Sequence, residues 1–140
     1  MIGKKVPDFT VDATAGPFTL SEHHGHPVVL YFYPKDDTPG CTTEACSFRD
    51  NLAAVQGQGA VLLGVSPDSV ASHQKFARKH GLEFPLLADT DKTVSKAYGV
   101  WVEKNMYGRK YFGVERSTFL IGPDGKIENI HKTPRKIFEL

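Results

Sequence analysis

Cysteine, methionine and tryptophan are scarce in this sequence of 140 residues, which contains two, two and one of them. No apolar run reaches the length of a membrane-spanning helix, and the N-terminal residues lack the apolar core of a secretory signal. No excess of one charge is present either, because 17 Lys and Arg are interleaved with 16 Asp and Glu. We therefore expect a cytoplasmic protein that binds neither nucleic acid nor membrane and acts on a small neutral or mixed substrate.

The length of the chain predicts a single domain that spans residues 1–140. Hydrophobic residues make up 40% of the sequence and charged residues 24%, as in ordinary globular proteins. We find no internal repeat and no low-complexity tract. A chain of this size needs neither a metal nor a disulfide to stabilise its core.

Two continuous apolar runs, at residues 27–33 and 60–66, are typical of buried central strands. Between them, the apolar residues of 46–56 recur at helical spacing. This order predicts a β-α-β unit in which the two strands are parallel.

The second half of the chain predicts further helices and a hairpin. An amphipathic helix is expected over residues 70–80 with its end at Gly81, then a short extended piece at 84–88 and a short helix at 93–98. A turn at residues 122–125 joins runs 117–121 and 126–130 into an antiparallel hairpin. The fold class is therefore α/β with a mixed central sheet flanked by helices, and the thioredoxin-like layout is one such arrangement.

The segment of greatest chemical interest joins the first buried strand to the helix that follows it and contains Cys41. The N-terminus of a helix favours a reactive thiolate through unpaired N–H groups and the positive end of its dipole. Gly40 allows backbone N–H groups close to a ligand, and Thr38 places a hydroxyl where it can donate to the sulfur or to a bound oxygen. The alternative is that Cys41 is an inert residue packed behind a loop.

The second cysteine, Cys46, lies five positions after Cys41. Two cysteines in a reducing compartment favour a redox, catalytic or metal role over a permanent disulfide. An intact helix separates Cα atoms five residues apart by about 8–9 Å, whereas a disulfide requires less than about 7 Å. A bond between them would require the first helical turn to unwind; the alternative is two unrelated core cysteines.

The segment resembles the peroxiredoxin family. Pro34, Thr38 and Cys41 fit its P-x-x-x-T-x-x-C signature, and the string from Thr38 to Cys46 is similar to the bacterioferritin comigratory protein, or peroxiredoxin Q, branch. The resemblance covers most of the chain, including the stretches at residues 3–9, 63–66, 84–89 and 115–121.

This resemblance implies a thioredoxin-like fold and a thiol peroxidase that reduces hydrogen peroxide and organic hydroperoxides without metal, flavin or haem. It implies that Cys41 is the peroxidatic cysteine and Cys46 the resolving cysteine of an intramolecular disulfide. It assigns peroxide binding to Thr38, Gly40 and Arg116, and shielding of the sulfur to Pro34. Without the resemblance, Arg116 would be taken for a surface or ion-pair residue.

The same resemblance implies that thioredoxin reduces the disulfide again, with a glutaredoxin-like donor as the alternative. We expect a monomer, or at most a weak dimer. Relatives end in a longer amphipathic helix, whereas Thr133 and Pro134 begin about two turns here, so we expect a shortened C-terminal helix.

Two other hypotheses are alternatives to a thiol peroxidase. A metal-binding module would use Cys41, Cys46 and the histidine group His23, His24 and His26, but their spacing is poor for a metal site. A dithiol oxidoreductase of the thioredoxin type would require the C-x-x-C motif, which is missing. The aromatic residues between the last predicted helix and the hairpin are expected to pack as a loop over the core, or else to line the peroxide entrance: Trp101, Tyr107, Tyr111 and Phe112.

Overall fold

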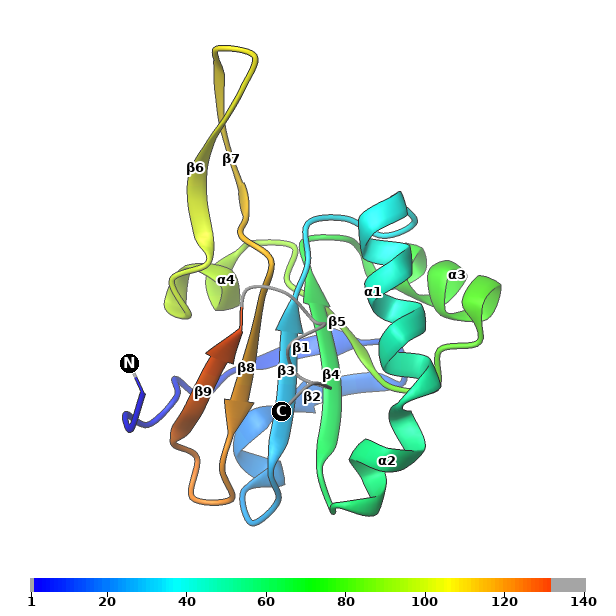
Figure 1. The fold of residues 1–140 in the computed structure, drawn as a ribbon, viewed down its shortest axis with the longest axis vertical. Helices are drawn as coiled ribbons and strands as arrows, with labels where there is room; N and C mark the ends of the chain where they lie inside the picture. The colour runs from blue at the N-terminus through cyan, green and yellow to red at the C-terminus, as the bar shows by residue number, and fades with distance from the viewer. Residues whose placement is uncertain (1, 132–140) are drawn as a thin grey trace.

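The computed structural model describes residues 2–131, which form strands and helices. The strands are β1 (Thr10–Ala13), β2 (Gly16–Thr19), β3 (Val28–Phe32), β4 (Val61–Ser66), β5 (Leu86–Ala88), β6 (Trp101–Met106), β7 (Arg109–Val114), β8 (Ser117–Ile121) and β9 (Ile127–His131). The helices are α1 (Pro39–Asp50), α2 (Leu52–Gly57), α3 (Val70–His80) and α4 (Thr93–Ala97), with a 3-10 helix η1 (Leu20–His23). Seven strands form one sheet in the order β2-β1-β5-β4-β3-β8-β9, and β6 and β7 form a separate two-stranded ribbon (Figure 1).

The centre of the sheet is parallel and its edges are antiparallel. Strand β3 pairs in parallel with β4, and β4 with β5, while β8 runs antiparallel to both β3 and β9. The predicted β-α-β unit and the predicted hairpin before the C-terminus are therefore both confirmed. The predicted mixed sheet flanked by helices is confirmed as well (Figure 1).

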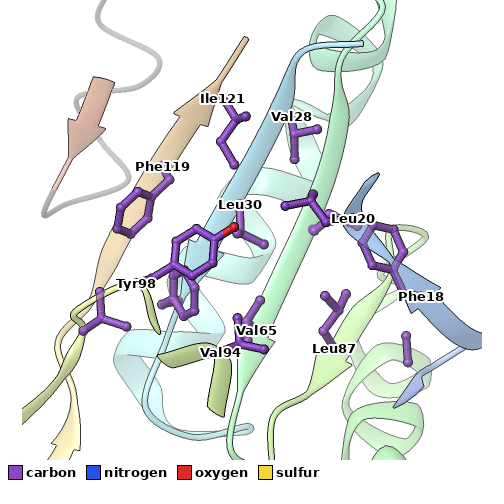
Figure 2. Packing of buried hydrophobic residues seen from close by; sticks show 14 of the residues in the cluster. Phe18, Leu20, Val28, Leu30, Val65, Leu87, Val94, Tyr98, Phe119 and Ile121 are labelled. Atoms are coloured by element: carbon purple, nitrogen blue, oxygen red, sulfur yellow. The ribbon is translucent and has the colours of Figure 1, made fainter. Parts of the chain in front are cut away.

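All five residues of β3 are buried, because helices cover the sheet on both faces at this strand. Side chains alternate along a strand, so Val28, Leu30 and Phe32 join the core on the face of α4. Figure 2 shows part of this core, including Val28, Leu30, Val94 and Tyr98. Val29 and Tyr31 join the core on the opposite face, beneath α1, α2 and α3. Continuous apolar sequence thus reflects a strand that is buried on both sides.

Helix α3 has the bounds predicted from its pattern. The Ser69 hydroxyl accepts a hydrogen bond from the backbone N–H of Ser72, and Gly81 ends the helix in the left-handed conformation at a φ of 64°. The prediction of one helix over residues 46–56 is partly wrong, since α1 begins at Pro39 and the helix is interrupted at Asn51 before α2 begins. The Asn51 side chain donates to the Ser47 carbonyl at 2.8 Å, which provides a local alternative to continued helix.

The aromatic stretch before β8 does not pack as a loop over the core. It forms the hairpin β6-β7, which projects from the body at the end of the sheet where β3 leads into α1 (Figure 1). Trp101, at its base, packs against the core, but Tyr107 at its tip is fully exposed, and Tyr111 and Phe112 are exposed too. The turn uses positive φ at both Tyr107 and Gly108, the geometry that matches the twist of a two-residue hairpin.

No helix within residues 2–131 combines the length and the apolar character needed to cross a membrane. The predicted short C-terminal helix at Thr133 and Pro134 lies outside the described residues.

Candidate active site

Cys41 lies in the first turn of α1, directly after the loop that follows β3. Thr38 is the N-cap residue in an extended conformation, and Pro39 is at the first helical position, where its missing N–H costs nothing. The Cys41 side chain is only 2% exposed and packs in the core beneath α1. The predicted position of Cys41 at a helix N-terminus is therefore confirmed. Although Cys41 is buried, its sulfur contacts a cation, which argues against an inert residue.

That cation is Arg116, which lies between the ends of β7 and β8. Its Nη2 atom lies 3.2 Å from Cys41 Sγ. A guanidinium remains charged at any ordinary pH, so it provides a fixed positive charge and N–H donors beside the sulfur. The structure thus joins two residues that the peroxiredoxin resemblance predicted to act together.

Glu44 holds the other end of the same guanidinium, a role that the sequence did not reveal. Its Oε1 accepts a 2.6 Å hydrogen bond from Arg116 Nη1, and its side chain is 2% exposed. Its Oε2 is buried without a hydrogen-bond partner among the described residues. Burial raises the pKa of Glu44 to about 7, and the pairing with Arg116 opposes that rise.

The other predicted site residues lie between the end of β3 and the first turn of α1. Pro34 is half-buried after β3, and Gly40 is exposed beside Arg116, since a β-carbon at Gly40 would lie 3.3 Å from Arg116 Nη2. The Thr38 hydroxyl donates to the Lys35 carbonyl at 3.0 Å. Donation from Thr38 to a substrate oxygen stays a prediction.

Cys46 lies on the same helix as Cys41, and both cysteines are free thiols. Cys46 is partly exposed, whereas Cys41 is buried. The intact helix between them agrees with the geometric argument that a disulfide and a folded first turn exclude each other.

A second cation near the site was also missed by the sequence analysis. Lys104 on β6 donates from Nζ to the Val114 carbonyl, two residues before Arg116. Burial lowers its pKa, and the neighbouring Arg116 charge lowers it further. The base of the exposed hairpin therefore belongs to the surroundings of the site.

The alternative metal module gains no support from the arrangement of its residues. His23 lies in η1 and stacks on Phe18 with ring centroids 4.6 Å apart. Within residues 2–131, the histidine, cysteine and acidic side chains close enough to share an ion are Asp36, Asp68 and His73, a group that includes neither cysteine.

Comparison with known proteins gives consistent matches over most of the chain. Residues 2–130 match the family model described as the AhpC/TSA family. A putative peroxiredoxin bcp of Coxiella burnetii is 51% identical over 130 residues, which are 92% of this chain and 86% of that protein. The peroxiredoxin Bcp of Bacillus subtilis is 49% identical over 127 residues, which are 90% of this chain and 81% of that protein.

Solved structures extend the similarity to the fold. The bacterioferritin comigratory protein of Xanthomonas campestris, studied for its alkyl peroxide reduction activity, superimposes with a TM-score of 0.84 at 46% identity, over 88% of this chain and 79% of that one. A cysteine-to-serine mutant of Xylella fastidiosa PrxQ gives a TM-score of 0.88 at 41% identity, over 93% of this chain and 84% of that one. The expected thioredoxin-like fold is thereby confirmed.

Proposed function

Because the chain belongs to the AhpC/TSA family, and within it to the Bcp or peroxiredoxin Q group, we propose that it is a thiol peroxidase with Cys41 as its nucleophile. The observation that carries this proposal is the 3.2 Å contact between Arg116 Nη2 and the sulfur of Cys41 in the first turn of α1. Thiolate chemistry requires such a positive environment.

In the first step, the Cys41 thiolate attacks the terminal oxygen of a hydroperoxide. An S–O bond forms as the O–O bond breaks, and the leaving oxygen takes up a proton to depart as water or an alcohol. Cys41 becomes a sulfenic acid. Arg116 donates to the sulfur and to the oxygens on which negative charge develops, and the neighbouring Thr38 and Gly40 bind the peroxide while Pro34 shields the sulfur.

In the second step, the thiol of Cys46 condenses with the sulfenic acid. The S–O bond of Cys41 breaks, a disulfide forms and water leaves. The first turn of α1 unwinds so that the two sulfurs meet, because an intact helix keeps their Cα atoms about 8–9 Å apart. Condensation also removes the sulfenic acid before a second peroxide can oxidise it irreversibly.

In the third step, an external dithiol protein reduces the disulfide and restores both thiols. Thioredoxin is the proposed donor, as the resemblance to peroxiredoxins implies, and a glutaredoxin-like protein is the alternative. The reductant attacks one sulfur of the Cys41–Cys46 disulfide to form a mixed disulfide, and its second thiol then releases the enzyme.

The test couples peroxide reduction to NADPH oxidation through thioredoxin and thioredoxin reductase. Wild type consumes NADPH only when hydrogen peroxide is present, Cys41→Ser is inactive, and Cys46→Ser performs one turnover and then stops. Replacing thioredoxin by a glutaredoxin system identifies the donor. Full activity in Cys41→Ser would overturn the proposal, and the purified protein would then be tested for bound metal.

The remaining features of the proposal concern the state of the protein. We place it in the cytoplasm as a monomer, folded as one domain over residues 1–140. Light scattering of the reduced and oxidised forms tests the monomer, since a stable dimer would double the measured mass.

A further inference from the structure

A buried hydrogen-bonded cluster connects the loop between β3 and α1 to helix α3. Its centre is Asp36, whose Oδ2 lies 2.8 Å from His73 Nδ1 and accepts a 2.8 Å hydrogen bond from Ser72 Oγ. The Asp36 Oδ1 accepts a 2.6 Å hydrogen bond from the Tyr33 hydroxyl. His73 is 0% exposed and Asp36 is 7% exposed, so these contacts replace water around both groups.

The hydrogen bonds of His73 require one proton between its ring and Asp36. Its Nε2 lies 2.9 Å from the Leu87 carbonyl, which can only accept, so Nε2 carries a hydrogen. Two lone pairs facing each other at 2.8 Å would repel, so a second hydrogen lies between Nδ1 and Asp36 Oδ2.

The main chain of Asp36 is fixed as firmly as its side chain. Its N–H donates to Asp68 Oδ2 at 2.8 Å, and the same oxygen accepts a 2.7 Å hydrogen bond from Ser66 Oγ at the end of β4. Asp36 Oδ2, His73 Nδ1 and Asp68 Oδ2 all take part in these hydrogen bonds. This pattern indicates a hydrogen-bonded network that fixes the loop, rather than a site for a cation.

The position of Asp36 gives this network a consequence for the site. Thr38, the N-cap residue of α1, follows two residues later, and Cys41 follows in the first turn. Asp36 is thus the last buried anchor of the chain before the helix that carries the sulfur, and this anchor is held by α3 and by the end of β4.

We propose that His73 is a positioning residue for the peroxide step, which acts by holding Asp36 and therefore the loop that presents Thr38 and Cys41. The inference rests on the proposed role of Cys41. It adds His73 to the site, a residue that lies on α3, whereas Cys41 lies on α1, and that is 37 positions from Asp36. The contact needed is the one to Asp36; the contact to Leu87 contributes to stability alone. Because unwinding of α1 begins after Thr38, condensation of Cys41 with Cys46 does not depend on His73.

Two substitutions separate the two contacts of the ring. In His73→Asn the side-chain amide replaces Nδ1 and keeps a donor toward Asp36, while the Leu87 carbonyl loses its partner. In His73→Gln the longer amide replaces Nε2, which keeps the Leu87 contact and removes the hydrogen bond between His73 and Asp36, while Asp36 keeps its donors Ser72 and Tyr33. Each variant loses one buried hydrogen bond, so each serves as the stability control of the other.

The experiment mixes each reduced protein with hydrogen peroxide, stops the reaction with an alkylating reagent after milliseconds to seconds, and measures thiol, sulfenic acid and disulfide by mass spectrometry. We expect His73→Asn to oxidise Cys41 within about threefold of wild type and His73→Gln to do so about 10- to 100-fold more slowly, as expected for a misplaced reacting group. Disulfide formation from the sulfenic acid proceeds at the wild-type rate in both. Urea unfolding midpoints fall by similar amounts.

Equal rates of Cys41 oxidation in the two His73 variants would overturn the inference. It would also be overturned if His73→Gln slowed disulfide formation as much as it slowed Cys41 oxidation. Should either variant fail to fold, Ser72→Ala removes another donor to Asp36 from the surface of α3, and a three- to tenfold slower oxidation of Cys41 is expected, with the exposed Lys75→Ala as control. Wild-type oxidation in Ser72→Ala would then overturn the inference. A wild-type chain that fails to react with peroxide would instead overturn the proposed function, and this inference with it.

Discussion

Arg116 and Cys41 are 75 positions apart in the sequence, yet Nη2 of the arginine lies 3.2 Å from the sulfur of the cysteine. The sheet produces this contact, because β8 pairs with β3 and so brings the residue before β8 next to the loop after β3. The guanidinium is held by Glu44, one turn after Cys41 on the same helix. Cation, nucleophile and supporting carboxylate are thus set by one strand pair and one helical turn.

Arg116→Lys should slow oxidation of Cys41 by hydrogen peroxide about 100-fold, the magnitude for loss of one preorganised donor to a developing negative charge. A single ammonium cannot contact both Cys41 and Glu44 in the geometry of the guanidinium. The rate is measured by rapid mixing and thiol alkylation. Arg109→Lys, at the exposed tip of the hairpin, is the matched control, and an equally small effect in both variants would argue against a role for Arg116.

Glu44 should make the folded protein more stable in mild acid than at neutral pH. Burial raises its pKa from 4.5 to about 7, so the folded state holds a proton that the unfolded state has released between these values. This contribution is fully present below pH 4.5 and is lost as the pH rises through about 7. It amounts to on the order of 3 kcal/mol.

The test for Glu44 is urea unfolding of the reduced protein at several pH values across this window. In Glu44→Gln the side chain no longer titrates, so the difference in unfolding free energy between wild type and variant should change with pH in the direction given above. A constant difference across the window would mean that Glu44 has the same protonation state in the folded and unfolded chains.

Gly40→Ala should separate activity from stability. Alanine favours helix over glycine by about 0.5–1 kcal/mol, but its β-carbon would lie 3.3 Å from Arg116 Nη2 and displace the guanidinium by a few tenths of an ångström. We expect about tenfold slower oxidation of Cys41 with unchanged or raised thermal stability. Gly57→Ala is the control, because its β-carbon meets nothing within 4 Å. Similar activity in both variants would rule out crowding of Arg116.

The sequence predicted the central strands and α3 well, because their signals are local. The apolar run of β3 reflects burial on both faces, and Ser69 and Gly81 mark the ends of α3 through their own hydrogen bonds and φ angle. The projecting hairpin was missed because β6 and β7 are mostly exposed and bury little apolar surface, and because Tyr107 is an unusual residue at positive φ.

The candidate site was predictable only where a local motif or a family pattern exists. Helix-start chemistry indicates Cys41, but Glu44 looks like an ordinary acidic residue near the start of a helix until Arg116, 72 positions away, is placed beside it. The same holds for Asp36 and His73, whose contact depends on how α3 crosses the sheet. Contacts between distant residues follow from topology, and spacing in the sequence contains no signal for them.

Disulfide formation should unfold the start of α1 while the rest of the sheet stays intact. Cys41 and Cys46 are five positions apart on the helix, so their Cα atoms, about 8–9 Å apart in a helix, must approach to within about 7 Å. Cys41 must also leave a site in which its side chain is 2% exposed and its contact to Arg116 is formed. The backbone N–H groups of residues 42–47 should therefore lose hydrogen-exchange protection on oxidation.

Hydrogen exchange followed by mass spectrometry tests this directly on the reduced protein and on protein treated with one equivalent of peroxide. Peptides from α3 and β4 are the internal reference and should exchange alike in both states, because no bond in the proposed cycle strains them. Cys46→Ser treated in the same way forms no disulfide and should keep α1 protected. If the oxidised wild type kept full protection in residues 42–47, the two cysteines would not be bonded to each other, and Cys46 would lose its resolving role.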